Sequence, residues 1–278
     1  MVPDRIAALM ETHPLPAISQ IILDVMHDLR DPQISTIDLA HKISHDQAIS
    51  VKLLQVANSP FYGLSRRIGS IQEAVVVLGF DTVRTLVVAI GMLQTKISPA
   101  GCAFGRKQFW LHNLLVGLCA KEMARQIQVD HEQAFIGGLL HDIGQMGLLL
   151  CAQEKYQPLL EQGLTGDLLV EAEMRDFDFD HAAMGAHMAA HWNFPETIQL
   201  AIANHHVCDP AQPDPVADLV YAANWMHEME QGGCDARTVV EIFPPSLRAR
   251  LGLADSVLFA GLDEFGSEEA TLLLDMLE

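Results

Sequence analysis

The amino-acid sequence predicts an all-α protein, and three observations lead to this prediction. Half of the 278 residues are hydrophobic but only 6% are aromatic, a composition typical of helices packed on helices. Apolar residues recur at helical spacing, as Ile18, Ile21, Ile22 and Val25 do near the N-terminus. No convincing pair of strands, internal repeat or low-complexity tract interrupts this pattern. We therefore expect a helical bundle preceded by an N-terminal helical subdomain.

Short helices separated by turn signals are predicted for the first hundred residues. Ser44 heads a capping-box pattern before one of these helices, and Ser70 with Glu73 forms another. Gly79 is expected to end the helix that follows Ser70, and Asp81 is expected to cap the next one. The predicted helical segments are 14–31, 35–44, 46–58, 73–79 and 81–95, with a loop over 59–69.

The best candidate for a linker is the stretch 97–105, which holds Pro, Gly and Ser between two strong helical patterns. It places a domain boundary near residue 100: an N-terminal helical subdomain over 1–100, a helical bundle over 101–231 and a helical appendage over 232–278. Phe243-Pro244-Pro245 is expected to break this appendage before an acidic final helix. Helices are predicted at about 106–128, 132–151, 154–163, 167–176, 180–192, 195–206, 214–231 and 254–277.

The formal net charge of −19 restricts the partners that the chain can bind. A surface that binds nucleic acid gains affinity by releasing counterions from phosphates, which requires clustered Lys and Arg. Two successive short helices invite a helix-turn-helix interpretation, but the charge favours an all-helical packing or docking module. The same acidity disfavours an anionic membrane surface. We therefore expect neither nucleic acid nor a membrane as a partner.

Cysteine usage and the N-terminal residues predict a cytoplasmic protein. The N-terminus lacks the long apolar segment of a secretory signal. The densest apolar stretch, 74–93, is interrupted by Asp81 and Arg84, so no membrane span is predicted. The cysteines are scattered, form no CxxC pair and fit reduced thiols; they are Cys102, Cys119, Cys151, Cys208 and Cys234.

The polar doublet His141-Asp142 lies in the middle of a long apolar run, residues 134–150 (AFIGGLLHDIGQMGLLL). An apolar run of this length is typical of a buried helix. Burying an imidazole beside a carboxylate costs free energy unless both groups find partners. The doublet is therefore expected to be hydrogen-bonded, metal-bound or both.

Further histidines lie on successive predicted helices and could converge on this doublet. The helix that carries His181 is rich in Ala and Gly, whose small side chains permit close helix contact. Imidazoles and a carboxylate suit divalent transition metals, and separate helices of a bundle can present them inward. A lone helical histidine is more often exposed or locally hydrogen-bonded, so the signal is their order along the chain. The candidate metal ligands are His112, His141, Asp142, His181, His205, His206 and Asn224.

Several short motifs follow one another in a fixed order along the chain. The first half contains the Leu15-Pro16 start, ANSPFYG at 57–63 and SIQEAVVVLGFDTVR at 70–84. The second half contains FW at 109–110, GLLHDIG at 138–144, WNFP at 192–195 and NHH at 204–206. HDIG at 141–144 is similar to the centre of the HD-domain superfamily of metal-dependent phosphohydrolases, and the whole order resembles the HDOD domain, the HD-related output domain of bacterial signalling proteins. The resemblance spans roughly residues 13–230 and implies an HD-like helical bundle with a signalling role.

The resemblance also implies a metal-ligand set. The matching positions are His112 for the early histidine, His141 and Asp142 for the doublet, His181 for the next histidine and His205 or His206 for the one after. The last superfamily ligand is an Asp, and Asn224 stands at its aligned position, where a neutral amide oxygen weakens affinity for a dication. Asp218 lies six residues earlier, on another face of the helix. The implied cofactor is a divalent transition metal: Fe, Mn, Zn or Ni.

Two further departures argue against hydrolysis of cyclic dinucleotides. Gln145 stands where Lys usually follows HDIG, and no Gly-Tyr-Pro motif follows the paired histidines. A lost cation near a phosphate removes an electrostatic contribution to the transition state. We therefore expect a non-catalytic module that acts on partner signalling proteins, with the cluster structural or vestigial. The alternative is a metal-dependent phosphohydrolase of nucleotides or cyclic nucleotides, with His141 and Asp142 in its active site.

A third interpretation is a ligand sensor. A nucleotide would bind in the former active-site cleft without being cleaved and shift the packing of the two halves, which requires different affinities for two states. No receiver or sensor segment is recognised in the chain. We therefore expect its input to come from another chain or from a small ligand.

Overall fold

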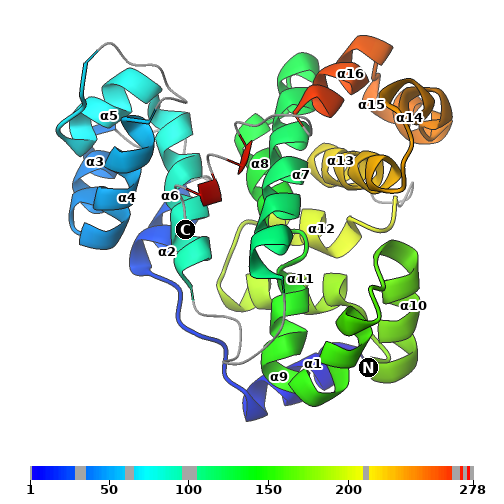
Figure 1. Ribbon diagram of the computed structural model, residues 1–278. Coiled ribbons are helices and arrows are strands. Elements are labelled where there is room, and N and C mark those ends of the chain that lie inside the picture. Colours follow the sequence, from blue (N-terminus) through cyan, green and yellow to red (C-terminus); the bar gives the residue numbers. More distant parts are fainter. Residues whose placement is uncertain are drawn as a thin grey trace. The chain divides into compact units, whose positions relative to one another are not determined.

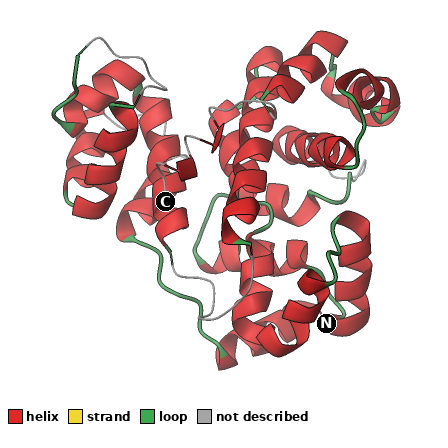
Figure 2. Cartoon of the chain, in the orientation of Figure 1, coloured by secondary structure: helices red, strands yellow, loops and turns green. Residues whose placement is uncertain are grey.

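The computed structural model describes residues 2–28, 36–59, 66–95, 105–208, 213–264, 270–271 and 274–275, and helices are the only regular elements within them (Figures 1 and 2). The predicted all-α fold is confirmed. The chain divides into two compact units: unit 1 comprises 1–16, 96–192 and 196–266, and unit 2 comprises 17–95, 193–195 and 267–278.

Unit 2 is a small bundle of short helices. Its longest helix, α6, is buried without interruption from Val83 to Leu93 and packs against α2 and α4. A smaller apolar cluster of Ala57, Ile68 and Ala74 lies where α4 meets α5. The helices are α2 (Gln20–Asp28), α3 (Thr36–Ser44), α4 (Gln47–Ala57), α5 (Ile71–Leu78) and α6 (Phe80–Gln94).

The predicted cap of α5 is confirmed, and two others are wrong. The Ser70 side chain accepts a hydrogen bond from the Glu73 backbone N–H at 3.2 Å, and Gly79 ends the helix with a φ of 88°. Asp46, not Ser44, caps α4, because Ser44 donates its hydroxyl back to a carbonyl of α3. Gly79 also precedes α6 directly, so Asp81 lies inside the first turn of that helix and does not cap it.

Unit 1 is a larger bundle in which α7 and α8 make an extensive contact with each other (Figure 1). α13 packs against both of them, and α11 packs against α9 and α12. The helices are α1 (Val2–Thr12), α7 (Arg106–Ile127), α8 (His131–Leu140), α9 (Ile143–Glu161), α10 (Gly166–Phe177), α11 (His181–His191), α12 (Glu196–Asn204), α13 (Pro215–Gln231), α14 (Ala236–Ile242), α15 (Pro245–Leu251) and α16 (Asp255–Asp263).

The apolar run predicted that the doublet His141-Asp142 lies inside a helix. The structure corrects this prediction, because the doublet forms the turn between α8 and α9. The predicted break after residue 151 corresponds to a kink within α9, where Ala152 has φ −147° and ψ 42°. The run His131–Glu161 is long and apolar enough to cross a membrane, but 89% of its most apolar window is buried inside the protein. That degree of burial is typical of a core helix.

The two ends of unit 1 differ from the sequence prediction. α1 was not predicted; its residues Ile6 and Met10 are buried, and it contacts α9 and α11, so the first sixteen residues group with the second half of the chain. Pro245 begins α15 rather than only ending a helix, because proline fits the first helical position. α16 ends at Asp263, short of the predicted 254–277.

Several predicted features lie outside the described residues. They are most of the linker 97–105, Cys102, much of the loop 59–69 and most of the chain after residue 264. The predicted domain limits therefore remain a prediction.

Candidate metal centre and ligand pocket

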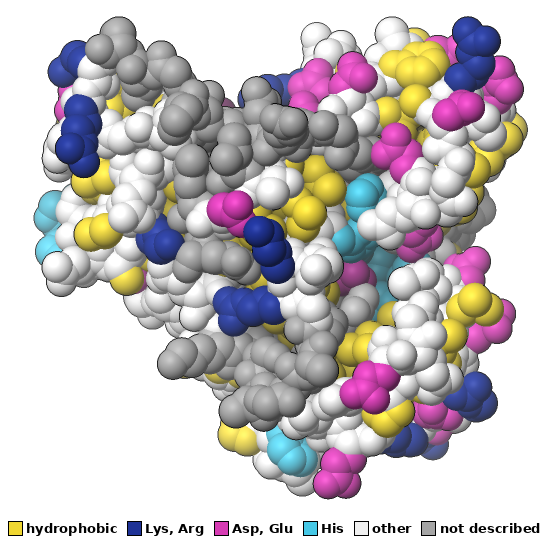
Figure 3. Space-filling view, viewed as in Figure 1, with side chains coloured by type: hydrophobic (Ala, Val, Ile, Leu, Met, Phe, Trp, Pro, Cys, Tyr) yellow, Lys and Arg dark blue, Asp and Glu magenta, His cyan; other side chains and the backbone are white. Residues whose placement is uncertain are grey.

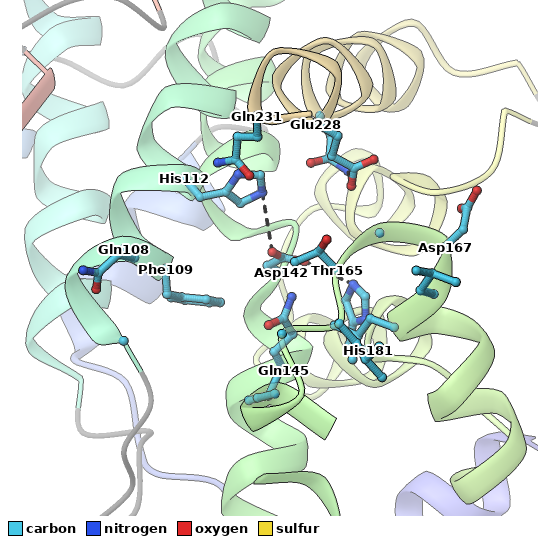
Figure 4. A pocket seen from close by; sticks show the side chains of 18 of the residues that line it. Gln108, Phe109, His112, Asp142, Gln145, Thr165, Asp167, His181, Glu228 and Gln231 are labelled. Atoms are coloured by element: carbon cyan, nitrogen blue, oxygen red, sulfur yellow. Dashed lines mark hydrogen bonds and ion pairs between the residues drawn. The ribbon is translucent and has the colours of Figure 1, made fainter. Parts of the chain in front are cut away.

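All seven predicted ligand residues lie within unit 1, on five different parts of the bundle. His112 comes from α7, His141 and Asp142 from the α8–α9 turn, and His181 is the first residue of α11. His205 and His206 follow α12 directly, and Asn224 lies on α13. Figure 4 shows His112 and His181 pointing toward Asp142 from opposite sides. The structure thus brings the predicted set together, and their role as metal ligands remains a prediction.

Glycines allow the helices that carry these residues to touch. A Cβ on Gly144 would overlap the backbone oxygen of His181 and lie 2.6 Å from the nitrogen of Gly185. A Cβ on Gly138 would lie 2.6 Å from Cα of Gly117 on α7. Atoms cannot approach so closely, so any side chain at these positions would push the helices apart. Glycine at 144 therefore allows α11 to reach the doublet, and glycines at 117 and 138 allow α7 to pack against α8.

Asp142 is shared between two groups of histidines. Its Oδ1 lies 3.1 Å from Nε2 of His181 and 3.5 Å from Nε2 of His205. Its Oδ2 lies 3.6 Å from Nε2 of His112 and 3.5 Å from Nε2 of His141. We call the first group, with His206, the Glu173 side, after the carboxylate that supports it. We call the second group the Asn224 side, because that amide lies next to it.

Hydrogen bonds fix the tautomers of two of these histidines. Nδ1 of His141 lies 2.7 Å from the Gly138 carbonyl, and Nδ1 of His205 lies 2.7 Å from the Ile202 carbonyl. A carbonyl only accepts hydrogen bonds, so each Nδ1 carries the proton. In the neutral form of each ring, Nε2 therefore carries the lone pair that a metal ligand needs.

Glu173, on α10, holds His181 in the same way and was missed by the sequence analysis. This fully buried carboxylate accepts hydrogen bonds from the Tyr156 hydroxyl at 2.6 Å, from the His181 backbone N–H at 2.8 Å and from His181 Nδ1 at 2.7 Å. A carboxylate behind a ligating histidine orients the ring and raises its basicity. Glu173 is thus the support of the Glu173 side.

The contact between His181 and His205 tests whether a cation fits the centre. Their Nε2 atoms lie 3.1 Å apart, and in a neutral His205 ring, whose Nδ1 faces the Ile202 carbonyl, that nitrogen carries a lone pair. Two lone pairs at this distance repel each other unless a proton or a metal ion lies between them. Nitrogen ligands that share one ion at about 2.1 Å and a right angle lie roughly 3.0 Å apart. The donor set and its spacing therefore fit a divalent transition metal.

In the metal-free protein a proton fills this role. Burial disfavours the charged form, but Glu173 and Asp142 outweigh it and raise the pKa of His181 to about 10. Burial would also raise the pKa of Asp142, but its neighbours, His141 first and then the hydrogen bond of His181, hold it well below its ordinary value. The centre therefore contains an imidazolium between two carboxylates.

Three other histidines of the centre have a pKa below the ordinary value, which favours their neutral form. Burial is the largest cause that lowers the pKa of His112, of His141 and of His206, and neighbouring imidazoles lower it further. Neutral imidazole is the form that binds metals. Asp218 contributes nothing here, because it pairs with Arg250 at 2.6 Å, as its position on another helix face predicted.

Asn224 and Glu228 lie one turn apart on α13, at the Asn224 side. The Asn224 amide donates a hydrogen bond to Oε1 of Glu228 at 3.1 Å. Burial, followed by the charge of Asp142, raises the pKa of Glu228 to about 7. On the same helix His227, which the sequence gave no reason to select, is buried with its ring 4.9 Å from that of His112.

A pocket of about 780 Å³ opens above the centre. In Figure 3, histidine side chains are visible in a hollow of the surface with acidic side chains nearby. The described residues that line the pocket include no Lys or Arg; their polar members are Gln108, His112, Asp142, Gln145, Gln157, Glu161, Thr165, Asp167, His181, His206, Asn224, Glu228 and Gln231. Such a lining offers hydrogen bonds and negative charge, and positive charge only through its histidines or a bound metal.

A helical bundle with a paired His-Asp turn and further histidines from three helices defines a protein of the HD type. The HDOD domain family matches residues 15–208, and the chain belongs to this family. It is 27% identical over 243 residues to an uncharacterized protein of Treponema pallidum (strain Nichols), covering 84% of this chain and 45% of that protein. The chain therefore spans about half the length of this curated relative.

Two solved structures share the fold at low sequence identity. An HDOD domain protein of unknown function from Geobacter sulfurreducens has 23% identity and a TM-score of 0.82, with 100% of this chain and 98% of that chain covered. A protein of Shewanella amazonensis SB2B, provisionally named a phosphohydrolase, has 21% identity and a TM-score of 0.77, with 98% of each chain covered.

Proposed function

We propose that this chain is a non-catalytic HDOD signalling module whose histidine centre binds a divalent transition metal and whose pocket binds a small ligand next to it. One observation carries the proposal: both carboxylate oxygens of Asp142 face histidine nitrogens at the floor of the pocket. We further propose that it acts in the cytoplasm on partner signalling proteins, as the family resemblance implies.

Each side of the centre would hold a metal with its own residues. His181, His205 and His206 with Oδ1 of Asp142 form one ligand group, and His112 and His141 with Oδ2 form the other. These imidazoles and the Asp142 carboxylate are suitable ligands for Fe, Mn, Zn or Ni. A bound dication would supply a Lewis acid that attracts an anionic or carbonyl oxygen of the ligand.

The absence of Lys and Arg among the described pocket residues favours binding over hydrolysis. Phosphoester hydrolysis develops negative charge on the phosphoryl oxygens, which enzymes balance with positioned cations. Here Gln145 lines the pocket beside Asp142, and Glu161, Asp167 and Glu228 add negative charge. A ligand can bind such a pocket through the metal and the amides, whereas a phosphoryl transition state would gain little from its walls.

A metal-dependent phosphohydrolase of nucleotides or cyclic nucleotides is the second candidate. Its support is the ligand set around His141 and Asp142, which lacks only the last carboxylate of the superfamily pattern, and the pocket that gives a substrate access to it. In this case the metal would activate the attack on phosphorus. The provisional name of the Shewanella amazonensis protein belongs to the same class of activity.

Metal content measured by plasma mass spectrometry tests the proposal. The protein is purified without a chelating tag, beside a His141→Ala/Asp142→Ala variant whose folding is checked by circular dichroism. We expect near-stoichiometric metal in the wild type and its loss in the variant. Metal-free wild type that also fails to bind added Mn²⁺ would overturn the metal centre. Metal-dependent turnover of a phosphoester, absent in the variant, would overturn the non-catalytic role in favour of the second candidate.

A further inference from the structure

The Asn224 side of the centre ends in an amide whose orientation matters. Asn224 is 2% exposed, and its Oδ1 makes no hydrogen bond of standard geometry. Its Nδ2 donates to Glu228 Oε1 at 3.1 Å. Burial lowers the pKa of His112, and a hydrogen-bonding interaction with the Asn224 side chain partly offsets this, so the amide oxygen lies on the His112 side as an acceptor. A buried oxygen that is satisfied only in part is costly, so its position next to a candidate metal ligand calls for an explanation.

We propose that Glu228 is a positioning residue, which turns the Asn224 amide so that its oxygen, and not its nitrogen, faces the His112–His141 end of the centre. This inference rests on the proposed metal site. A carboxylate only accepts hydrogen bonds, so it selects the amide nitrogen and leaves the oxygen for the centre. An amide turned the other way would direct N–H donors at a cation and an oxygen at a carboxylate, and both contacts would be repulsive.

The start of α10 leaves room for the Glu228 carboxylate. Gly166, the first residue of α10, has a φ of 53°, and a Cβ there would lie 3.3 and 3.4 Å from the two carboxylate oxygens of Glu228. A side chain at position 166 would therefore crowd the carboxylate that accepts the hydrogen bond from Asn224.

The pair explains how this chain can do without an aspartate at position 224. An aspartate offers two equivalent oxygens and needs no partner to orient it, whereas an asparagine offers one oxygen and must be oriented. Glu228 supplies that orientation from one turn further along α13. Asn224 and Glu228 together thus replace a single carboxylate.

Binding of Mn²⁺ alone, followed by electron paramagnetic resonance of the free ion, tests this role. Glu228→Leu removes the acceptor but keeps much of the side-chain volume. We expect it to lower the affinity for Mn²⁺ at the Asn224 side by about tenfold, the usual effect of losing a partner of a metal ligand. Glu228→Gln retains an acceptor oxygen without the charge and should stay within about threefold of the wild type. Loss of affinity in Glu228→Gln equal to that in Glu228→Leu would instead show that the charge matters, and would overturn the positioning role.

The decisive comparison uses an Asn224→Asp background. There Glu228→Leu should no longer weaken Mn²⁺ binding, because a carboxylate needs no orientation; an undiminished effect would overturn the inference. Wild type that binds Mn²⁺, with a Glu228→Leu variant that binds equally well, would overturn the positioning role alone. Wild type that binds no Mn²⁺ would remove the proposed metal centre and this inference with it. Thermal melting of each metal-free variant shows that a weak binder is folded.

Discussion

The two sides of the histidine centre share Asp142 but are built by opposite means. On the Glu173 side a fully buried carboxylate, fixed by Tyr156, holds His181 from behind. On the Asn224 side His112 borders the pocket, and the supporting carboxylate, Glu228, acts through an amide. Both sides line the pocket, so they differ in their support: a carboxylate contacts the histidine directly on one side and acts through an amide on the other. We therefore expect substitutions of the supporting residues to affect metal binding more strongly on the Glu173 side.

The largest expected effect comes from Gly144→Ala, which would break the contact on which the Glu173 side depends. The new methyl group would overlap the backbone of His181 and press α11 away from the doublet. We expect a loss of about 3 kcal/mol or more in the free energy of unfolding and a melting temperature lower by roughly 10 °C. Gly69→Ala is the matched control, because no atom lies within 4 Å of its Cβ. Melting temperatures that fall equally in both variants would contradict the close-contact explanation.

Glu173→Gln should be the next most damaging change and should separate the two sides. The amide nitrogen of the new side chain would face a donor of His181 or Tyr156, so we expect the free energy of unfolding to fall by about 2 kcal/mol. We also expect the affinity for metal on the Glu173 side to fall by roughly ten- to hundredfold. Tyr156→Phe, the control, removes one hydrogen bond and should cost about 1 kcal/mol while leaving metal affinity nearly unchanged. Calorimetric Mn²⁺ titrations measure the metal affinity of each variant, and thermal melts measure its stability. Equal metal loss in the two variants would show that Glu173 acts only through general packing.

The pH dependence of stability should differ between metal-free and metal-loaded protein. In the metal-free protein the pKa of His181 is raised from 6.5 to about 10, so its contribution is complete below pH 6.5 and is lost as the pH rises through 10. The slope from this group is at most about 1.4 kcal/mol per pH unit. A bound metal replaces that proton, so the alkaline loss should disappear.

The loss of folding stability at acidic pH, which we call the acid limb of the profile, should arise from other histidines; the loss at alkaline pH is the alkaline limb. Burial lowers the pKa of His112, His141 and His206, so their contribution is present above the ordinary value of 6.5 and is lost as the pH falls below it. Thermal melts from pH 5 to 10, with a chelator or with excess Mn²⁺, measure both limbs. Identical alkaline limbs with and without metal would contradict the assignment of His181 as a ligand.

The smallest effect is expected from Gln145→Lys, which adds a cation to the pocket. In the metal-loaded protein, affinity for inorganic phosphate should rise by about threefold, the scale of a partly screened ion pair, with little change in stability. Gln157→Lys places the same charge elsewhere on the pocket wall and is the control. A rise of the same size in both variants would show that net charge, rather than position 145, governs anion binding.

The sequence predicted the helical fold, because helices depend on local pattern, and it selected histidines that the fold gathers around Asp142. Helical spacing located most helices, and the order of histidines along the chain selected residues that the fold brings within a few ångströms of Asp142. The caps were less predictable: Ser44 and Asp46 both suit an N-terminus, and the backbone conformation decides between them. α15 was missed because a Pro-Pro pair is compatible with either a break or a helix start.

The supporting carboxylates were missed because their role depends on tertiary contacts. α10 carries several acidic residues, and only burial distinguishes Glu173 from its neighbours. One signal was present: Glu173 shares the inward face of the helix with Leu169 and Ala172, at the positions i, i+3 and i+4. Glu228 gave no such signal, since it follows Asn224 on a helix that also ends in acidic residues.

The distribution of the ligands along the chain has a consequence for folding. His112 and His205 are 93 positions apart (205 − 112), and the ligand set draws on five separate parts of unit 1. A metal ion held by them would join segments that lie far apart along the chain, so its binding would be coupled to folding. By mass action the free energy of unfolding would then rise with the free metal concentration, by about 2.7 kcal/mol at a hundred times the dissociation constant. Metal supply would therefore influence how long this protein stays folded.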